Sequence, residues 1–138
     1  MSVDMLQKKI RKIKNPAAVV FAPTAEMIPE GYDTAADYCC ALLEALKDRV
    51  SAIRISFGAF ALLGPDGLGQ MAKVMQKARE LEYYVLLDWL CVGDPALAEE
   101  SAKKILVEEC WPCDGVVIGG YAGTDCLKPY VLASEEKK

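Results

Sequence analysis

The segment Tyr83–Pro95, YYVLLDWLCVGDP, decides the fold. Its first part, Tyr83–Leu87, is a continuous apolar run that predicts a buried β-strand. Asp88 follows this strand, and Asp94-Pro95 has the residue types of a helix N-cap and a first helical position. A buried strand that ends in a carboxylate and leads directly into a helix is typical of an α/β active site. No basic side chain lies between the two aspartates, so the segment contains carboxylates but no proton donor.

The rest of the chain repeats the same order of strand and helix. Apolar runs predict strands at Ala17–Ala22, Ser51–Ser56, Tyr83–Leu87 and Val116–Ile118, the last starting near Asp114. Helical patterns cover 2–14, 34–49 with Thr34 as N-cap, 64–81, 94–109, and a short final segment that follows Gly119-Gly120 and Gly123 and contains Pro129. The tail from Ser134 is expected to be frayed.

This alternation predicts the α/β class with a parallel sheet and right-handed crossovers, and the apolar run Ala17–Ala22 suits a strand buried on both faces. Four strand–helix units fit a small doubly wound sheet, and they also fit half of an eight-unit (β/α)8 barrel. The spacing of the segments does not distinguish these two architectures.

Composition narrows the class of protein. A length of 138 residues predicts one domain, 1–138, and 53% hydrophobic with 26% charged residues is an ordinary globular composition. The net charge of −4 and the pI near 4.9 disfavour non-specific binding to nucleic acid or anionic membranes. Because no apolar run approaches the length of a membrane span and the start lacks a signal-peptide core, we expect a cytoplasmic protein.

The chain contains no histidine. This absence excludes Ser-His-Asp and Cys-His catalysis and removes the commonest metal ligand, so no metal and no cofactor are expected. The six cysteines fit a reducing compartment. Cys91 is more consistent with an inert thiol than with a nucleophile, because no base accompanies it. The pair Cys110 and Cys113 follows a helix and precedes a strand, opposite to the order in thioredoxin-like sites, which favours a structural or incidental role.

Arg54 and Asp88 form the strongest candidate site. Arg54 lies inside an isoleucine-rich strand, where an arginine requires a partner. The second and third strands of a parallel sheet are expected to be neighbours, which places Asp88 within reach. The pair predicts either a dyad that binds an anion or a ribose, or an ion pair that only closes the end of the sheet.

Four further residues are candidates for substrate binding: Ser56, Gly119, Gly120 and Tyr121. The two glycines follow the fourth strand, where a phosphate could approach the backbone, although a tight turn explains them equally. Asp94 is the third candidate catalytic residue, with a simple N-cap as its alternative role.

Four segments together resemble a known family. They are NPAAVVFAP at Asn15–Pro23, AIRISFGAFALLGPDG at Ala52–Gly67, YVLLD at Tyr84–Asp88 and DGVVIGGYAGTD at Asp114–Asp125. In this order and spacing they are similar to the first four strand motifs of orotidine 5′-phosphate decarboxylase, a (β/α)8-barrel lyase of pyrimidine biosynthesis. The resemblance implies the first half of such a barrel, a nucleoside monophosphate as ligand, and no cofactor.

The chain departs from this family's pattern at the residues that perform the chemistry. The family needs a lysine that protonates the carbanion left by decarboxylation, and this position is Leu90 or Cys91 here, depending on which aspartate is aligned. Ala22 replaces an aspartate that holds the ribose, and Arg54 replaces a second lysine. We therefore expect weak or absent decarboxylation.

A half-barrel leaves two sheet edges and one sheet face open. Closure by a second copy predicts a homodimer or larger assembly, so a non-catalytic nucleotide-binding or self-assembling module is the alternative to a decarboxylase. A truncated gene is a third interpretation of the same sequence.

Overall fold

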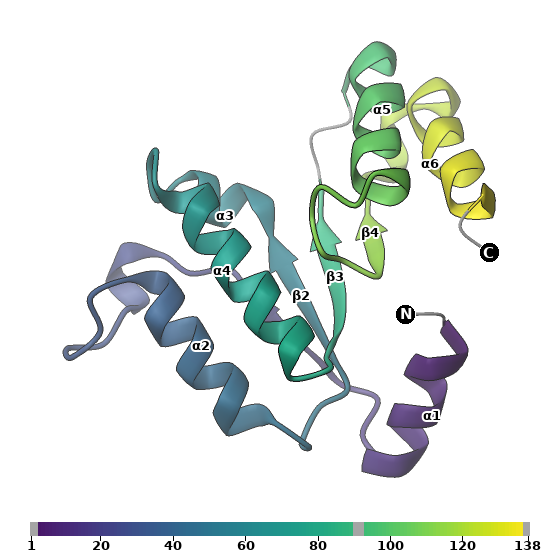
Figure 1. Ribbon diagram of the computed structural model, residues 1–138. Coiled ribbons are helices and arrows are strands. Elements are labelled where there is room, and N and C mark those ends of the chain that lie inside the picture. Colours follow the sequence, from purple (N-terminus) through teal and green to yellow (C-terminus); the bar gives the residue numbers. More distant parts are fainter. Residues whose placement is uncertain (1–2, 90–92, 137–138) are drawn as a thin grey trace.

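The computed structural model describes residues 3–89 and 93–136 and contains one parallel four-stranded sheet (Figure 1). Its strands follow one another in the order of the chain, each paired with the next: β1 (Ala18–Phe21), β2 (Ala52–Ser56), β3 (Tyr84–Asp88) and β4 (Gly115–Val117). The predicted class, the four strands and the parallel pairing are all confirmed.

Helices connect the strands. The main ones are α1 (Val3–Ile13), α2 (Ala35–Leu46), α3 (Phe57–Ala61), α4 (Gly67–Glu80), α5 (Pro95–Ala102) and α6 (Thr124–Glu136). Short 3-10 turns lie at Ala25–Met27 (η1) and Gly120–Ala122 (η3), and a π-helical segment, η2 (Lys103–Val107), continues α5.

The predicted helix starts are confirmed where a polar side chain caps them. Thr34 accepts a hydrogen bond from the backbone N–H of Asp37 at 3.1 Å, which satisfies one of the free donors at the start of α2. Helix α3 was not predicted, because its residues continue the apolar run of β2 without a break in pattern. Helix α6 continues through Glu136, so the prediction of a frayed tail from Ser134 is wrong for residues 134–136.

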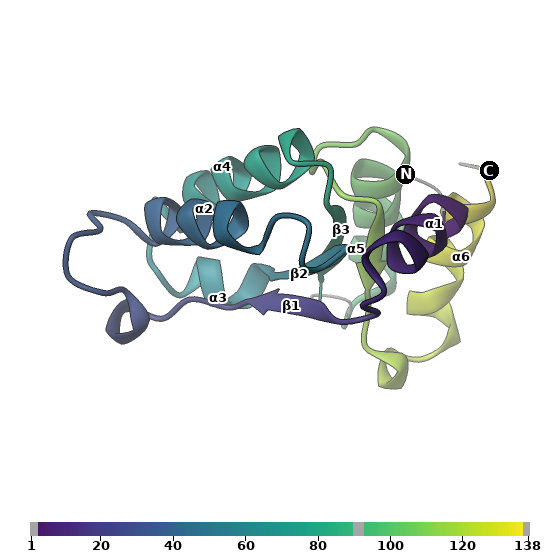
Figure 2. The ribbon, with the colours of Figure 1, turned by 90° about the horizontal axis from the view of Figure 1, so that it is seen from below.

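One face of the sheet forms the main core. Alternate residues of the strands, Phe21, Ile53, Ile55, Val85 and Leu87, are at most 3% exposed and pack under the helices. Figure 2 shows α2 and α4 side by side on one side of β1 and β2. This face explains why the strands are rich in large apolar residues.

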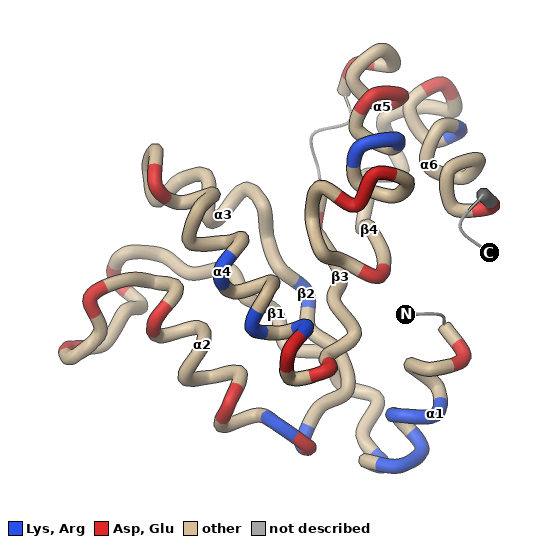
Figure 3. Tube along the Cα trace, viewed as in Figure 1, with Lys and Arg blue, Asp and Glu red and all other residues tan. Residues whose placement is uncertain are grey.

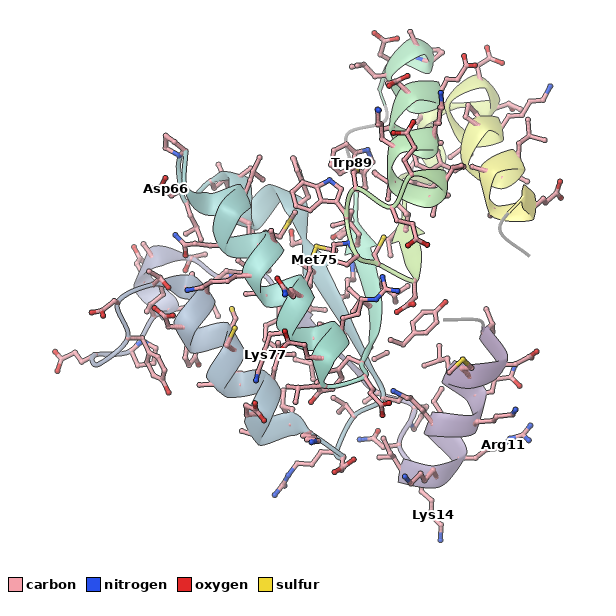
Figure 4. The ribbon with its side chains drawn as sticks, in the orientation of Figure 1. Arg11, Lys14, Asp66, Met75, Lys77 and Trp89 are labelled. Carbon is pink, nitrogen blue, oxygen red and sulfur yellow. The ribbon has the colours of Figure 1, made fainter. Side chains whose placement is uncertain are left out.

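Helices α2 and α4 also contact each other. Met75 of α4 is fully buried in the core, while Lys77 lies towards α2 (Figure 4). The ammonium of Lys77 is 2.6 Å from a carboxylate oxygen of Glu44 on α2. This hydrogen bond with Glu44 raises the pKa of Lys77 and lowers the pKa of Glu44. The two helices therefore join through an apolar face and an exposed ion pair.

The other face of the sheet is not covered by any described helix over its first strands. The aligned residues Val20, Arg54 and Leu86 project there, and Val20 is 55% exposed. The prediction that Ala17–Ala22 is a strand buried on both faces is therefore wrong. A smaller second core lies beyond β4, where α5 and α6 pack around Ala98, Cys126 and Tyr130.

Each turn from a helix into the next strand contains a residue in the left-handed conformation. Lys14, Asp48, Glu82 and Glu109 have φ between 52° and 62°, although none is glycine. Such a residue ends a helix by turning its backbone back on the last turn, and a Cβ atom makes this conformation unfavourable.

Glycine at one of these positions is expected to stabilise the protein. Because Glu82 has a φ of 61°, Glu82→Gly removes the strain that its Cβ atom causes in the folded state. Glycine also raises the conformational entropy of the unfolded chain, which opposes folding by a smaller amount. We therefore expect the free energy of unfolding to rise by about 0.5–1 kcal/mol. The matched control is Glu80→Gly, an exposed glutamate in α4, which is expected to lose about 0.5–1 kcal/mol. Urea unfolding of both variants tests the assignment, and a loss of stability in Glu82→Gly contradicts it.

Candidate functional site

The candidate site lies where β2 and β3 end. The strands pair so that Ser56 is opposite Asp88 and Arg54 is opposite Leu86. Because side chains alternate along a strand, Arg54 and Asp88 project from the same face of the sheet. Arg54 Nη2 donates a hydrogen bond to Asp88 Oδ2 at 2.6 Å. The predicted neighbouring strands and the predicted contact between the two side chains are confirmed.

This ion pair is only partly satisfied. Arg54 Nε and Asp88 Oδ1 are both buried, and neither has a hydrogen-bond partner among the described residues. Asp88 is 7% exposed, whereas the side chain of Arg54 is 37% exposed and therefore reaches solvent. A buried polar atom without a partner costs about 1–3 kcal/mol. The pair thus retains one donor and one acceptor for a further group.

Ser56 has a structural contact that the sequence did not indicate. Its hydroxyl accepts a hydrogen bond from the backbone N–H of Ala59 at 3.3 Å and so caps α3. The residue lies on the same face as Asp88, at the same level of the sheet. Ser56 therefore lies next to the ion pair, where it could contact a ligand, and it also caps α3.

Asp94 is an N-cap, as its simpler interpretation predicted. Its Oδ1 accepts a hydrogen bond from the N–H of Ala96 at 2.9 Å, and Pro95 occupies the first turn of α5. Asp94 is exposed. Leu90 and Cys91, the positions that correspond to the missing lysine, lie outside the described residues.

The glycine-rich segment after β4 forms the 3-10 turn η3. Tyr121 is fully exposed there, and a Cβ at Gly119 or Gly120 would meet no atom within 4 Å. Only Gly123, with a φ of 89°, needs glycine for its backbone conformation. The turn therefore leaves open space beside Gly119 and Gly120 at the same end of the sheet as Asp88.

An aromatic pair that the sequence did not predict lies beside the site. Phe57 follows β2 and Trp89 follows β3, and their rings meet edge to face with centroids 4.4 Å apart. Figure 4 shows Trp89 between α4 and α5. The adjacent ends of two parallel strands bring these residues together, so their positions directly after the strands were the available signal.

The thiols of two cysteines in the described part of the chain are protonated at neutral pH. Burial raises the pKa of Cys39 to about 11, and desolvation also raises the pKa of Cys110, so neither thiol is a thiolate at neutral pH. Cys110 and Cys113 precede β4 and lie at the end of the sheet opposite Asp88. Within residues 3–89 and 93–136, no cluster of three or more cysteine or carboxylate side chains could hold a metal ion.

Comparisons with known proteins agree on one group. An orotidine 5′-phosphate decarboxylase of Rhodopirellula baltica is 26% identical over 105 residues, which are 72% of this chain and 35% of that protein. The chain resembles the orotidine 5′-phosphate decarboxylases. No family model matches the sequence.

Solved structures of orotidine 5′-phosphate decarboxylases share the fold. One from Toxoplasma gondii has a TM-score of 0.82 at 19% identity and matches 98% of this chain but 45% of its own. One from Streptomyces avermitilis has a TM-score of 0.81 at 19% identity and matches 97% of this chain and 49% of its own. The UMP synthase of Leishmania donovani has a TM-score of 0.75 at 18% identity, over 94% of this chain and 27% of that one. The chain therefore spans less than half the length of each of these proteins.

None of the helices in the described ranges is long and apolar enough to cross a membrane. What this chain shares with the orotidine 5′-phosphate decarboxylase structures is its parallel α/β sheet, which matches part of their barrel fold.

Removal of the charge of Asp88 is expected to destabilise the protein. Asp88→Asn keeps the shape but leaves Arg54 without its charged partner, and because Arg54 is partly solvated we expect a loss of about 1–2 kcal/mol. The control is Glu108→Gln, which breaks a 2.7 Å pair with Lys104 on the surface and should leave the stability unchanged within error. Urea unfolding measures both, and equal effects would contradict the distinction between the two pairs.

Proposed function

We propose that this chain binds a nucleoside monophosphate at the C-terminal end of its sheet, as a decarboxylase-like half-barrel with little or no decarboxylase activity. The observation that carries the proposal is the Arg54–Asp88 pair with its free buried donor and acceptor. The resemblance to orotidine 5′-phosphate decarboxylases supports the choice of ligand.

The remaining polar atoms of the pair match this class of ligand. The guanidinium of Arg54 has further N–H groups that can donate to a phosphate or carboxylate oxygen. Asp88 Oδ1 can accept a hydrogen bond from a ribose hydroxyl. The open space at Gly119 and Gly120 leaves room for a ligand beside the ends of the strands.

The residues present do not support efficient protonation of a carbanion. Arginine is a poor acid at neutral pH because its pKa exceeds about 12. Leu90 and Cys91, one of which takes the lysine position, provide no ammonium group. Binding without turnover is therefore the function that these residues favour, in a cytoplasmic protein without nucleic-acid or membrane partners.

Titration with 6-azauridine 5′-monophosphate is expected to raise the melting temperature in a saturable way, because a ligand that binds only the folded state stabilises it. Arg54→Gln should weaken this binding about tenfold through the loss of a charge-assisted hydrogen bond. Lys73→Gln, a charge change on exposed α4 surface away from the site, should bind as the wild type does.

The same samples are tested for release of CO2 from orotidine 5′-monophosphate. Turnover that depends on Asp88 would contradict the inactive assignment, and the absence of any thermal shift would contradict the nucleotide site. Equal binding by wild type and Arg54→Gln would place the ligand elsewhere.

The open sheet face supports a second candidate, a self-assembling module. Val20 is 55% exposed on this face, and among the described strands β1 pairs only with β2 and β4 only with β3. Exposed strand edges tend to pair with another chain. A second copy whose β4 lies beside β1 would cover the edges and the face together.

Light scattering after size-exclusion chromatography at micromolar concentration tests this assembly. We expect a homodimer or larger oligomer in the wild type and its dissociation in Val20→Asp, which places a charge on the open face. Val131→Asp is the matched control, since Val131 is 54% exposed on α6. A monomeric wild type, or equal dissociation of both variants, would reject the assembly.

A further inference from the structure

A cavity of about 90 Å³ lies at the end of the sheet opposite Asp88. It is bounded by the last turns of α1 and by the turns that lead into β2 and β3. Its polar lining consists of three lysines, two carboxylates and two hydroxyls: Lys9, Lys12, Lys47, Asp48, Glu82, Ser51 and Tyr83, whose hydroxyl already donates to the carbonyl oxygen of Leu43.

Ser51 is the unusual member of this lining. It is only 2% exposed, and its Oγ has no hydrogen-bond partner among the described residues. Its backbone is held in place, because the carbonyl oxygen accepts a hydrogen bond from the N–H of Tyr84 at 3.0 Å. A fixed, buried hydroxyl without a partner is unfavourable unless a further group fills the cavity and bonds to it.

The lysines of the cavity lack the close carboxylate contacts that other lysines make in the described part of the chain. No ion pair there includes Lys9, Lys12 or Lys47, whereas Lys77 and Lys104 each contact a carboxylate at 2.6–2.7 Å. Backbone N–H groups beyond α1, α2 and α4 bond to carbonyls in the last turns of these helices, so those carbonyls have donors without the lysines.

The basic side chains in and just after α1 differ in their surroundings. Figure 3 shows the run of basic residues on this helix. Arg11 and Lys14 extend away from the rest of the molecule (Figure 4), whereas Lys9 and Lys12 line the cavity. Together with Lys47 they give the cavity three positive charges against the two of Asp48 and Glu82, a formal excess of one.

The volume sets the size of the ligand. The cavity, at about 90 Å³, is far smaller than the roughly 300–1,000 Å³ of pockets that hold drug-sized molecules, so it cannot enclose a whole nucleotide. It can hold a few water-sized groups, which is the scale of a single oxyanion. A partly protonated oxyanion also suits the mixed lining, because its oxygens accept from lysine and serine while its own O–H donates to a carboxylate.

We propose that this cavity binds a small, hydroxyl-bearing oxyanion of the phosphate class, held by Ser51 and the three lysines. The site lies at the opposite end of the sheet from Arg54 and Asp88, so it is independent of the nucleotide site proposed above. The lysine and serine donors come from α1 and from the turn before β2, and Glu82 comes from the turn before β3, so an occupant would connect these three segments.

Inorganic phosphate is the probe. We expect a saturable rise in the melting temperature of the full chain with phosphate at pH 7.5, beyond that given by sodium chloride of equal ionic strength. Calorimetric titration should show that Lys12→Gln and Ser51→Ala each weaken binding about tenfold, the effect of one charge-assisted hydrogen bond. Lys8→Gln, on the same helix but outside the cavity lining, is the control and should bind as the wild type does.

Three outcomes would overturn the site. They are the absence of a phosphate effect beyond that of chloride, equal weakening by Lys8→Gln, and unchanged binding in Lys12→Gln and Lys9→Gln. If Ser51→Ala does not fold, the phosphate binding of Lys12→Gln and Lys9→Gln alone tests the site. Unchanged phosphate binding in Arg54→Gln is expected, and it separates this site from the nucleotide site.

Discussion

The parallel pairing of β2 with β3 is the constraint on which the rest of the structure depends. Its register places Ile53 and Ile55 beside Val85 and Leu87 on the covered face, where they form the centre of the main core. The same register places Arg54 and Asp88, two positions apart along the paired strands, on the open face, where their side chains meet. A shift by one residue would exchange the two faces, burying the charges and exposing the aliphatic residues. The core and the ion pair are therefore two results of one alignment.

Much of this arrangement could be predicted from the sequence. The strands are short apolar runs separated by helical patterns, and Thr34 and Asp94 mark helix starts by residue type alone. Even the contact between Arg54 and Asp88 follows from the rule that consecutive strands of such sheets are neighbours. Local sequence patterns are sufficient for these predictions because each strand pairs with the next strand along the chain.

The failures have a different physical origin. The burial of Val20 depends on what covers the open face, and no property of β1 itself determines this. Helix α3 directly follows an apolar strand, and its five residues are too few to show either the helical period of about 3.6 residues or the strand period of two. The free atoms of the ion pair, Arg54 Nε and Asp88 Oδ1, depend on side-chain orientation, which the residue types do not reveal. The contact of Phe57 with Trp89 likewise requires two strand ends at a known distance.

The left-handed residues before the strands have a consequence for how this fold can vary. Lys14, Asp48 and Glu82 each reverse the chain within a short turn, and each turn sets where the following strand begins. An inserted residue there would displace the strand and rotate its alternation between the two faces. The connections that follow the strands, at the end of the sheet near Asp88, do not set where a strand begins, because each of them leads into a helix. Length variation among related sequences should therefore accumulate beside Asp88, and new ligand specificities can arise at that end while the sheet stays unchanged.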